Sequence, residues 1–96
     1  MATPAKNACA RHILVKTRAE ADSIKQRLDQ GADFGQLAKR FSTCPSGKKG
    51  GDLGEFKRGT MAKAFDSVVF NKPVLVVHGP VKTQFGFHLI QTIFRT

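Results

Sequence analysis

The chain of 96 residues contains no Trp, no Tyr and only two cysteines, Cys9 and Cys44. Two cysteines are too few for a disulfide-stapled fold, and their positions match no metal or redox motif. The chain also lacks a run of about 18 apolar residues, and its N-terminus, MATPAKNACA, lacks the apolar stretch of a signal peptide. We therefore expect two free thiols and a cytoplasmic protein that does not enter a membrane.

Acidic residues are also scarce, because seven Asp and Glu stand against sixteen Lys and Arg, which gives a formal charge of +9. This charge permits encounters with polyanions, acidic clients or nucleic acid. The basic residues are scattered in pairs, without a nucleic-acid-binding signature: Lys39-Arg40, Lys48-Lys49 and Lys57-Arg58. We expect weak, non-specific polyanion binding and no more.

The composition that remains is that of one folded domain. Hydrophobic residues make up 41% of the chain, charged residues 24%, and eight residues are Phe. A chain of this length buries enough surface for one core and not for two. Residues 1–10 are small and polar without periodicity, so we expect them to form a flexible tail that precedes a domain of residues 11–96.

The first half of this domain predicts one strand and two helices. His12 to Val15 is apolar on both faces, which is typical of an interior strand, with His12 and Leu14 on the opposite side from their neighbours. Thr17 and Glu20 form a capping box ahead of a helix over residues 18–30. Asp33 is the expected cap of a second helix, which carries an apolar stripe and ends near Ser42.

The second half predicts a loop or short helix over residues 42–51, a strand over 52–56, a third helix and a closing hairpin. The apolar stripe of the third helix is expected at Met61, Ala64, Phe65 and Val68. The hairpin strands, 81–83 and 87–94, flank Gln84-Phe85-Gly86. Together these elements predict an α+β fold. If the first and last strands are neighbours at its centre, His12 and His88 face each other.

Five blocks of sequence, in this order, resemble the parvulin family of peptidyl-prolyl cis/trans isomerases over about residues 11–95. They are His12-Ile13-Leu14-Val15-Lys16, Cys44, Gly50-Gly51-Asp52-Leu53-Gly54, Met61 with Phe65, and Gly79-Pro80-Val81 with Phe85-Gly86-Phe87-His88. The chain is most similar to bacterial single-domain members. The resemblance implies the FKBP-like parvulin fold, a small, mostly antiparallel four-stranded sheet surrounded by three to four helices.

The resemblance also implies a site with an apolar and a polar part. Leu53, Met61, Phe65 and Phe85 are expected to hold the proline ring, although a stripe such as that of Met61 and Phe65 is often only a core face. The polar residues are expected to be His12, Cys44, Thr83 and His88, with the two histidines bonded to each other and Thr83 bonded to one of them. Cys44 is either a polarizable group beside the substrate carbonyl, a nucleophile or an inert thiol. No metal or cofactor is expected.

The expected substrates are proline-containing segments of unfolded or nascent proteins, acted on by a monomer. The chain lacks the extended basic loop and WW module of phospho-dependent parvulins, since only Lys16-Thr17-Arg18 precedes the first helix. We therefore expect phosphate-independent activity that favours an apolar residue before proline. The alternatives are a chaperone-like module that binds proline segments with little catalysis, a basic protein tethered to nucleic acid or ribosomes, and a thiol hydrolase. The last has no oxyanion-hole or third-residue signature.

Overall fold

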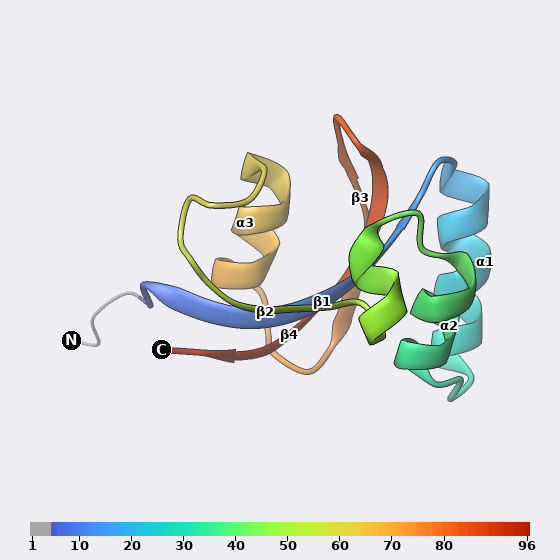
Figure 1. Ribbon diagram of the computed structural model, residues 1–96, viewed down its shortest axis with the longest axis horizontal. Coiled ribbons are helices and arrows are strands. Elements are labelled where there is room, and N and C mark those ends of the chain that lie inside the picture. Colours follow the sequence, from blue (N-terminus) through green and yellow to red (C-terminus); the bar gives the residue numbers. More distant parts are fainter. Residues whose placement is uncertain (1–4) are drawn as a thin grey trace.

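The computed structural model describes residues 5–96, in which one four-stranded antiparallel sheet is packed against three α-helices and one 3-10 helix (Figure 1). The elements in chain order are β1 (Asn7–Val15), α1 (Arg18–Asp29), α2 (Phe34–Phe41), η1 (Pro45–Lys49), β2 (Asp52–Lys57), α3 (Lys63–Asn71), β3 (Val77–Thr83) and β4 (Gly86–Arg95). The predicted α+β fold with four strands is confirmed.

The first and last strands lie at the centre of the sheet, whose order is β2-β1-β4-β3. In the antiparallel register, Leu14 pairs with His88 and His12 pairs with Ile90. Because side chains alternate along a strand, His12 and His88 emerge on the same face, one diagonal step apart. This confirms the predicted neighbourhood of the two strands.

The two faces of the sheet are covered by different helices, which lie at opposite ends of the molecule in Figure 1. On one face, α1 and α2 pack on what we call the back cluster: Ile13, Val15, Ala21, Ile24, Phe34, Leu37, Ala38 and Leu89. On the other face, α3 packs on the front cluster: Ala8, Ala10, Phe56, Phe65, Val69, Phe70 and Ile90. The alternation predicted for residues 12–15 is confirmed by this division.

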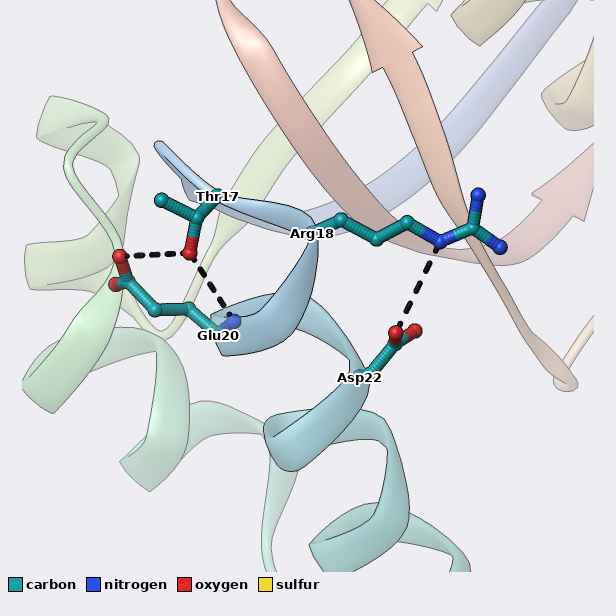
Figure 2. Close-up of polar contacts among 4 residues, drawn as sticks. All are labelled: Thr17, Arg18, Glu20 and Asp22. Carbon is teal, nitrogen blue, oxygen red and sulfur yellow. Dashed lines mark hydrogen bonds and ion pairs between the residues drawn. The ribbon is translucent and has the colours of Figure 1, made fainter.

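Side-chain caps fix where the two helices of the back face begin. The Thr17 hydroxyl accepts a hydrogen bond from the Glu20 amide at 3.2 Å and donates one to the Glu20 carboxylate at 3.1 Å (Figure 2). Asp33 accepts a bond from the Gln36 amide at 2.9 Å. Each cap satisfies a first-turn amide that has no partner within its helix, so both predicted starts are confirmed.

The predicted flexible tail of residues 1–10 is wrong for residues 7–10, which form the first half of β1. Ala8 and Ala10 are completely buried in the front cluster, and Ala8 pairs with Phe56 of β2 and Arg95 of β4. Alanine gives so weak an apolar signal that this half-buried strand could not be seen in the sequence. Residues 1–4 of the predicted tail lie outside the described residues.

The predicted stripe of the third helix is also partly wrong. The buried positions of α3 are Phe65, Val69 and Phe70, whereas Ala64 is exposed and Met61 precedes the helix. Val68 is only half-buried. The pattern was ambiguous because apolar residues occupy both phases of the helix, and contact with the sheet selects the second phase.

Candidate active site

A cavity of about 370 Å³ opens on the front face, beside the end of the sheet that α3 leaves uncovered. Its lining comes from strands β1, β2 and β4, from η1 and α3, and from three connecting segments: His12, Leu14, Thr43, Cys44, Pro45, Leu53, Met61, Ala62, Phe65, Phe85 and His88. None of these residues is a Lys, Arg, Asp or Glu. The wall is therefore apolar except at the two imidazoles, the thiol and one hydroxyl.

The two histidines are bonded directly to each other, because 2.9 Å separates the Nδ1 atoms of His12 and His88. Their rings are nearly parallel, with an interplanar angle of 19°. Both side chains are almost fully buried, at 5% and 4% exposure. A short bond between two ring nitrogens requires that one of them carries a hydrogen and the other accepts it.

Burial keeps this pair neutral. It lowers the pKa of His12 from 6.5 to about 4, with a second contribution from the neighbouring His88, and it lowers the pKa of His88 as well. Each ring therefore holds a single hydrogen near pH 7. Phe65 packs against both members of the pair. Its ring stands edge-on to the imidazoles of His12 and His88, at centroid distances of 5.4 and 5.3 Å.

Hydrogen bonds extend from the pair at both outer nitrogens. On the β4 side, His88 Nε2 lies 2.7 Å from the Thr83 hydroxyl, which also accepts a bond from the Phe85 amide at 3.1 Å. On the β1 side, His12 Nε2 lies 3.2 Å from the Ser46 hydroxyl, and Ser46 lies 3.3 Å from Cys44 Sγ. One continuous chain thus joins the hairpin turn to the thiol.

The loop that carries Cys44 is held against β1 by a close backbone contact. His12 N–H donates to the Gly51 carbonyl at 3.0 Å, and Gly51 has φ +86°, where a side chain would collide with the His12 carbonyl. The Ser42 hydroxyl accepts a bond from the Cys44 amide at 3.4 Å and another from the Leu14 amide at 3.1 Å. These contacts set the distance between the thiol and the histidine pair.

The apolar wall has one rigid side and one projecting residue. Phe65 is 2% exposed and packs at a tilt against Phe56, so its ring is fixed in the floor of the cavity. Leu53 comes from β2, and Met61 lies in the turn before α3. Phe85 is 64% exposed at the tip of the β3–β4 hairpin, with its backbone amide bonded to Thr83. The cavity can therefore enclose a small apolar ring with one side open.

All eight residues singled out in the sequence meet in this site. Seven line the cavity, and Thr83 lies behind it, bonded to His88. Sequence reasoning missed Ser46, the bridge between Cys44 and His12, and the lining residues Leu14, Thr43, Pro45 and Ala62. The signal that would have found Ser46 is its position two residues after Cys44. His78 is outside the site and bonds to the Pro73 carbonyl.

The two cysteines are both free and have different surroundings. Cys9 lies on β1 away from the cavity, and burial raises its pKa, followed by the nearby Asp52 and Glu55. Cys44 bonds to Ser46, which stands between it and His12. This arrangement differs from a nucleophilic thiol paired directly with a histidine base.

Within residues 5–96, no group of three or more His, Cys, Asp or Glu side chains is arranged to hold a metal ion. Over the same residues, no helix is both long enough and apolar enough to cross a bilayer.

The chain is similar to known proteins over nearly its whole length. Residues 5–93 match the family model described as Rotamase, PPIC-type PPIASE domain. The foldase protein PrsA of Geobacillus sp. (strain WCH70) is 47% identical over 83 residues, which are 85% of this chain and 30% of that relative. The chain thus spans between a quarter and a third of the length of the curated relatives that it matches.

Several solved structures share its fold. The crystal structure of the peptidylprolyl isomerase PrsA from Bacillus anthracis has a TM-score of 0.92 and 36% identity, over 96% of this chain and 43% of that one. The solution structure of NmPin, described as the parvuline of Nitrosopumilus maritimus, has a TM-score of 0.83 and 39% identity, over 96% of this chain and 100% of that one.

Proposed function

The chain belongs to the PpiC-type family of peptidyl-prolyl cis/trans isomerases, the parvulins, and we propose that the front-face cavity is where it rotates the bond before proline. The observation that carries this proposal is the cavity itself, in which an apolar enclosure sized for a small ring meets a row of bonded, uncharged polar groups. Polypeptides that contain proline are its substrates.

The chemistry requires rotation without bond cleavage. The barrier is about 18–20 kcal/mol because the amide has partial double-bond character. At the twisted transition state the amide loses resonance and its nitrogen becomes pyramidal, so groups that favour this form over the planar one accelerate the reaction. Met61, Phe65 and Leu53 exclude water and hold the ring. The carbonyl of the substrate residue before proline rotates about this bond. It faces the polar side of the cavity, where Cys44 and the histidine pair lie.

The histidines act in this proposal as positioning residues rather than as proton donors. Each is neutral, buried and already engaged at both ring nitrogens. A ring with no unbonded nitrogen cannot approach substrate without breaking the chain of bonds. The pair therefore holds Thr83, and through it the Phe85 amide, in place on one side and Ser46 with Cys44 on the other.

We propose that recognition does not require phosphate. A phosphorylated residue before proline needs Arg or Lys beside the cavity, and no lining residue carries charge. Phe85 projects at the hairpin tip beside the opening, where an aromatic ring favours an apolar residue next to proline.

For partners, we propose unfolded or nascent proteins, with the chain acting as a monomer and binding polyanions only weakly. Relatives named foldase PrsA, and structures described as SurA-like chaperones, support a role in folding. The bonded set of His12, His88 and Thr83 favours catalysis over the chaperone-like alternative, because passive binding of proline does not need it. Two free cysteines support a cytoplasmic location, which cell fractionation tests.

The test is a prolyl isomerisation assay with tetrapeptides that differ only in the residue before proline: Leu, Ala, Glu, Ser and phosphoserine. We expect acceleration of all unphosphorylated peptides, with Leu the best and phosphoserine no better than Glu. A preference for phosphoserine over Glu would overturn phosphate independence alone. If no peptide is accelerated at micromolar protein, the isomerase assignment fails, and tight binding without acceleration would support the chaperone-like alternative.

A further inference from the structure

A second hollow, of about 690 Å³, lies between α2, η1 and the strands of the sheet, and its lining shares no residue with the front-face cavity. Arg11 places it on the back face, because the Arg11 guanidinium lies 4.5 Å from the centre of the Phe34 ring in the back cluster. We call this hollow the basic groove.

The lining of the basic groove is charged, whereas that of the cavity is not. Four cations and two carboxylates line it: Arg11, Lys39, Lys48 and Lys49 with Asp33 and Asp52. Four positive and two negative charges leave a net charge of +2. The groove therefore attracts anions.

None of these four cations is paired with a carboxylate in the part of the chain that the structure describes. The two ion pairs among residues 5–96 both lie within α1. The two carboxylates of the groove accept hydrogen bonds from backbone amides instead. Asp33 accepts from the Gln36 amide at 2.9 Å, and Asp52 accepts from the Gly54 amide at 2.9 Å. The cations are thus left available to an external carboxylate.

The groove combines one fixed cation with adjustable ones. Arg11 is held by its stacking on Phe34 and by its Nε–H, which donates to Gln91 at 2.7 Å. Lys48 and Lys49 are exposed at the end of η1. One charge is therefore set in place before a ligand arrives, and the lysines can follow the ligand's shape.

The short helix η1 connects the basic groove to the cavity. Pro45 at its first position lines the cavity, whereas Lys48 and Lys49 at its end line the groove. A 3-10 helix rises about 2.0 Å per residue, so its two ends lie roughly 8 Å apart. An extended polypeptide rises about 3.3 Å per residue. A chain held at its proline in the cavity therefore reaches the groove after about four residues.

We propose that the basic groove binds acidic segments of substrate polypeptides, about four residues from the proline that the cavity holds. This inference rests on the proposed function, because it gives the groove a part in substrate binding. The lining favours a polypeptide over nucleic acid, since it contains no aromatic ring to stack on bases and its two carboxylates repel a phosphate backbone. The groove contributes to KM and leaves the rotation step to the cavity.

The first test compares KM for peptides that share a Leu-Pro core and carry an Asp-Glu-Asp block at different distances from it. The block begins about two or about four residues from proline, on either side, and control peptides carry Asn-Gln-Asn. At low salt, we expect the more distant block, on one side of proline, to lower KM roughly fivefold without changing kcat. The gain should vanish in about 0.5 M salt. No gain, or equal gains at both distances, would overturn the proposal.

A pair of double variants separates the groove from the overall positive charge. Lys48→Ala with Lys49→Ala should abolish the gain and leave the control peptides unaffected. Lys6→Ala with Lys72→Ala is the matched control, because it removes two exposed lysines that line neither the groove nor the cavity. This control should keep the gain. Equal losses in both double variants would refute the groove as the site of attraction.

Binding without turnover distinguishes this proposal from the isomerase function. In ¹H–¹⁵N spectra of the labelled protein, the proline-free peptide Gly-Asp-Glu-Asp-Gly should shift the amide signals of Gly35, Lys49 and Gly50, and leave those of Met61 and Phe65 in place. If these shifts occur but no Leu-Pro peptide is accelerated, the isomerase function fails and the groove stands. If peptides are accelerated but the groove signals do not move, the groove alone fails. Displacement of the peptide by an oligo-dT strand or by phosphatidylglycerol vesicles at lower anion concentration would assign the groove to those ligands and overturn the proposal.

Discussion

The two faces of the sheet use the same central strands in opposite ways. Ile13 and Leu89 point into the back cluster, which α1 and α2 close completely with apolar side chains. Their neighbours His12 and His88 point to the front, where α3 covers only part of the sheet and a cavity takes the rest. Each strand thus anchors the fold with one set of residues and builds the site with the other.

The difference shows how a small domain can bury a polar pair at its centre. Polar burial is costly unless every group is bonded, and both histidines have partners at both ring nitrogens. The apolar back face gives the strands the rigidity that holds these short distances. Stability and function are therefore expected to respond separately when the two faces are altered.

The largest expected effect comes from the back face. Leu89→Ala removes a side chain with 0% exposure, so we expect the free energy of unfolding in urea to fall by about 3 kcal/mol. The kcat/KM of the protein that remains folded should change little. The matched control is Leu75→Ala, at a leucine with 63% exposure, which should leave stability within about 0.5 kcal/mol. Equal losses in the two variants would contradict the assigned core.

The next largest effect is the pH dependence of the free energy of unfolding. It arises from the front face, because the buried histidines lie there. A pKa lowered from 6.5 to about 4 means that the unfolded chain takes up a proton at His12 before the folded one does. Stability from neutral His12 is present above pH 6.5 and is lost as pH falls toward 4. We expect a loss of about 2 kcal/mol between pH 7 and pH 5 in urea titrations. In His12→Gln, which cannot protonate, the slope should flatten; an unchanged slope would refute the cause.

A smaller change is expected for substrate binding at the projecting aromatic. Phe85→Ala removes an exposed ring beside the cavity, so we expect a roughly tenfold loss of kcat/KM for a Leu-Pro peptide, about 1.4 kcal/mol, mostly through KM. Its melting temperature should match the wild type. Phe94→Ala is the control, because Phe94 is also exposed but lies outside the cavity. Similar kinetics in both variants would remove Phe85 from the site.

The smallest effect tests whether the back face tolerates a local defect. Thr17→Ala deletes the cap of α1 seen in Figure 2, which should cost about 1 kcal/mol of unfolding free energy. Thr17→Ser keeps the hydroxyl and should restore most of it. The kcat for a Leu-Pro peptide should stay at the wild-type value in both. A fall in kcat would show that the two faces are coupled more closely than the structure indicates.

The sequence was most informative where side-chain chemistry has a fixed spacing. The capping box at Thr17 and the alternation from His12 to Val15 predicted α1 and the two faces correctly, because local geometry determines both. It failed at Ala8 and Ala10, whose burial depends on strands β2 and β4 that lie far along the chain. No local rule contains that pairing.

The residues of the site were predicted from the sequence, but the contacts between them were not, because those contacts also join segments that lie far apart along the chain. The residues came from a family resemblance, and the structure adds how they are joined. Ser46 has no periodicity and no partner nearby in sequence, apart from Cys44; its link to His12 exists only because Gly51 brings the loop against β1. The phase of α3, with Phe65 and Val69 inward, was likewise chosen by the sheet.

The bond between His12 and His88 spans 76 residues, and it closes the largest loop in the site. Until β4 takes its place beside β1, the thiol, the rings and the hairpin tip belong to separate stretches of an unfinished chain. Joining such distant segments costs conformational entropy, and this cost is offset only when the rest of the sheet forms. The proposed active site is thus complete only when the fold is complete, so turnover of a prolyl peptide reports that the chain has reached its native state.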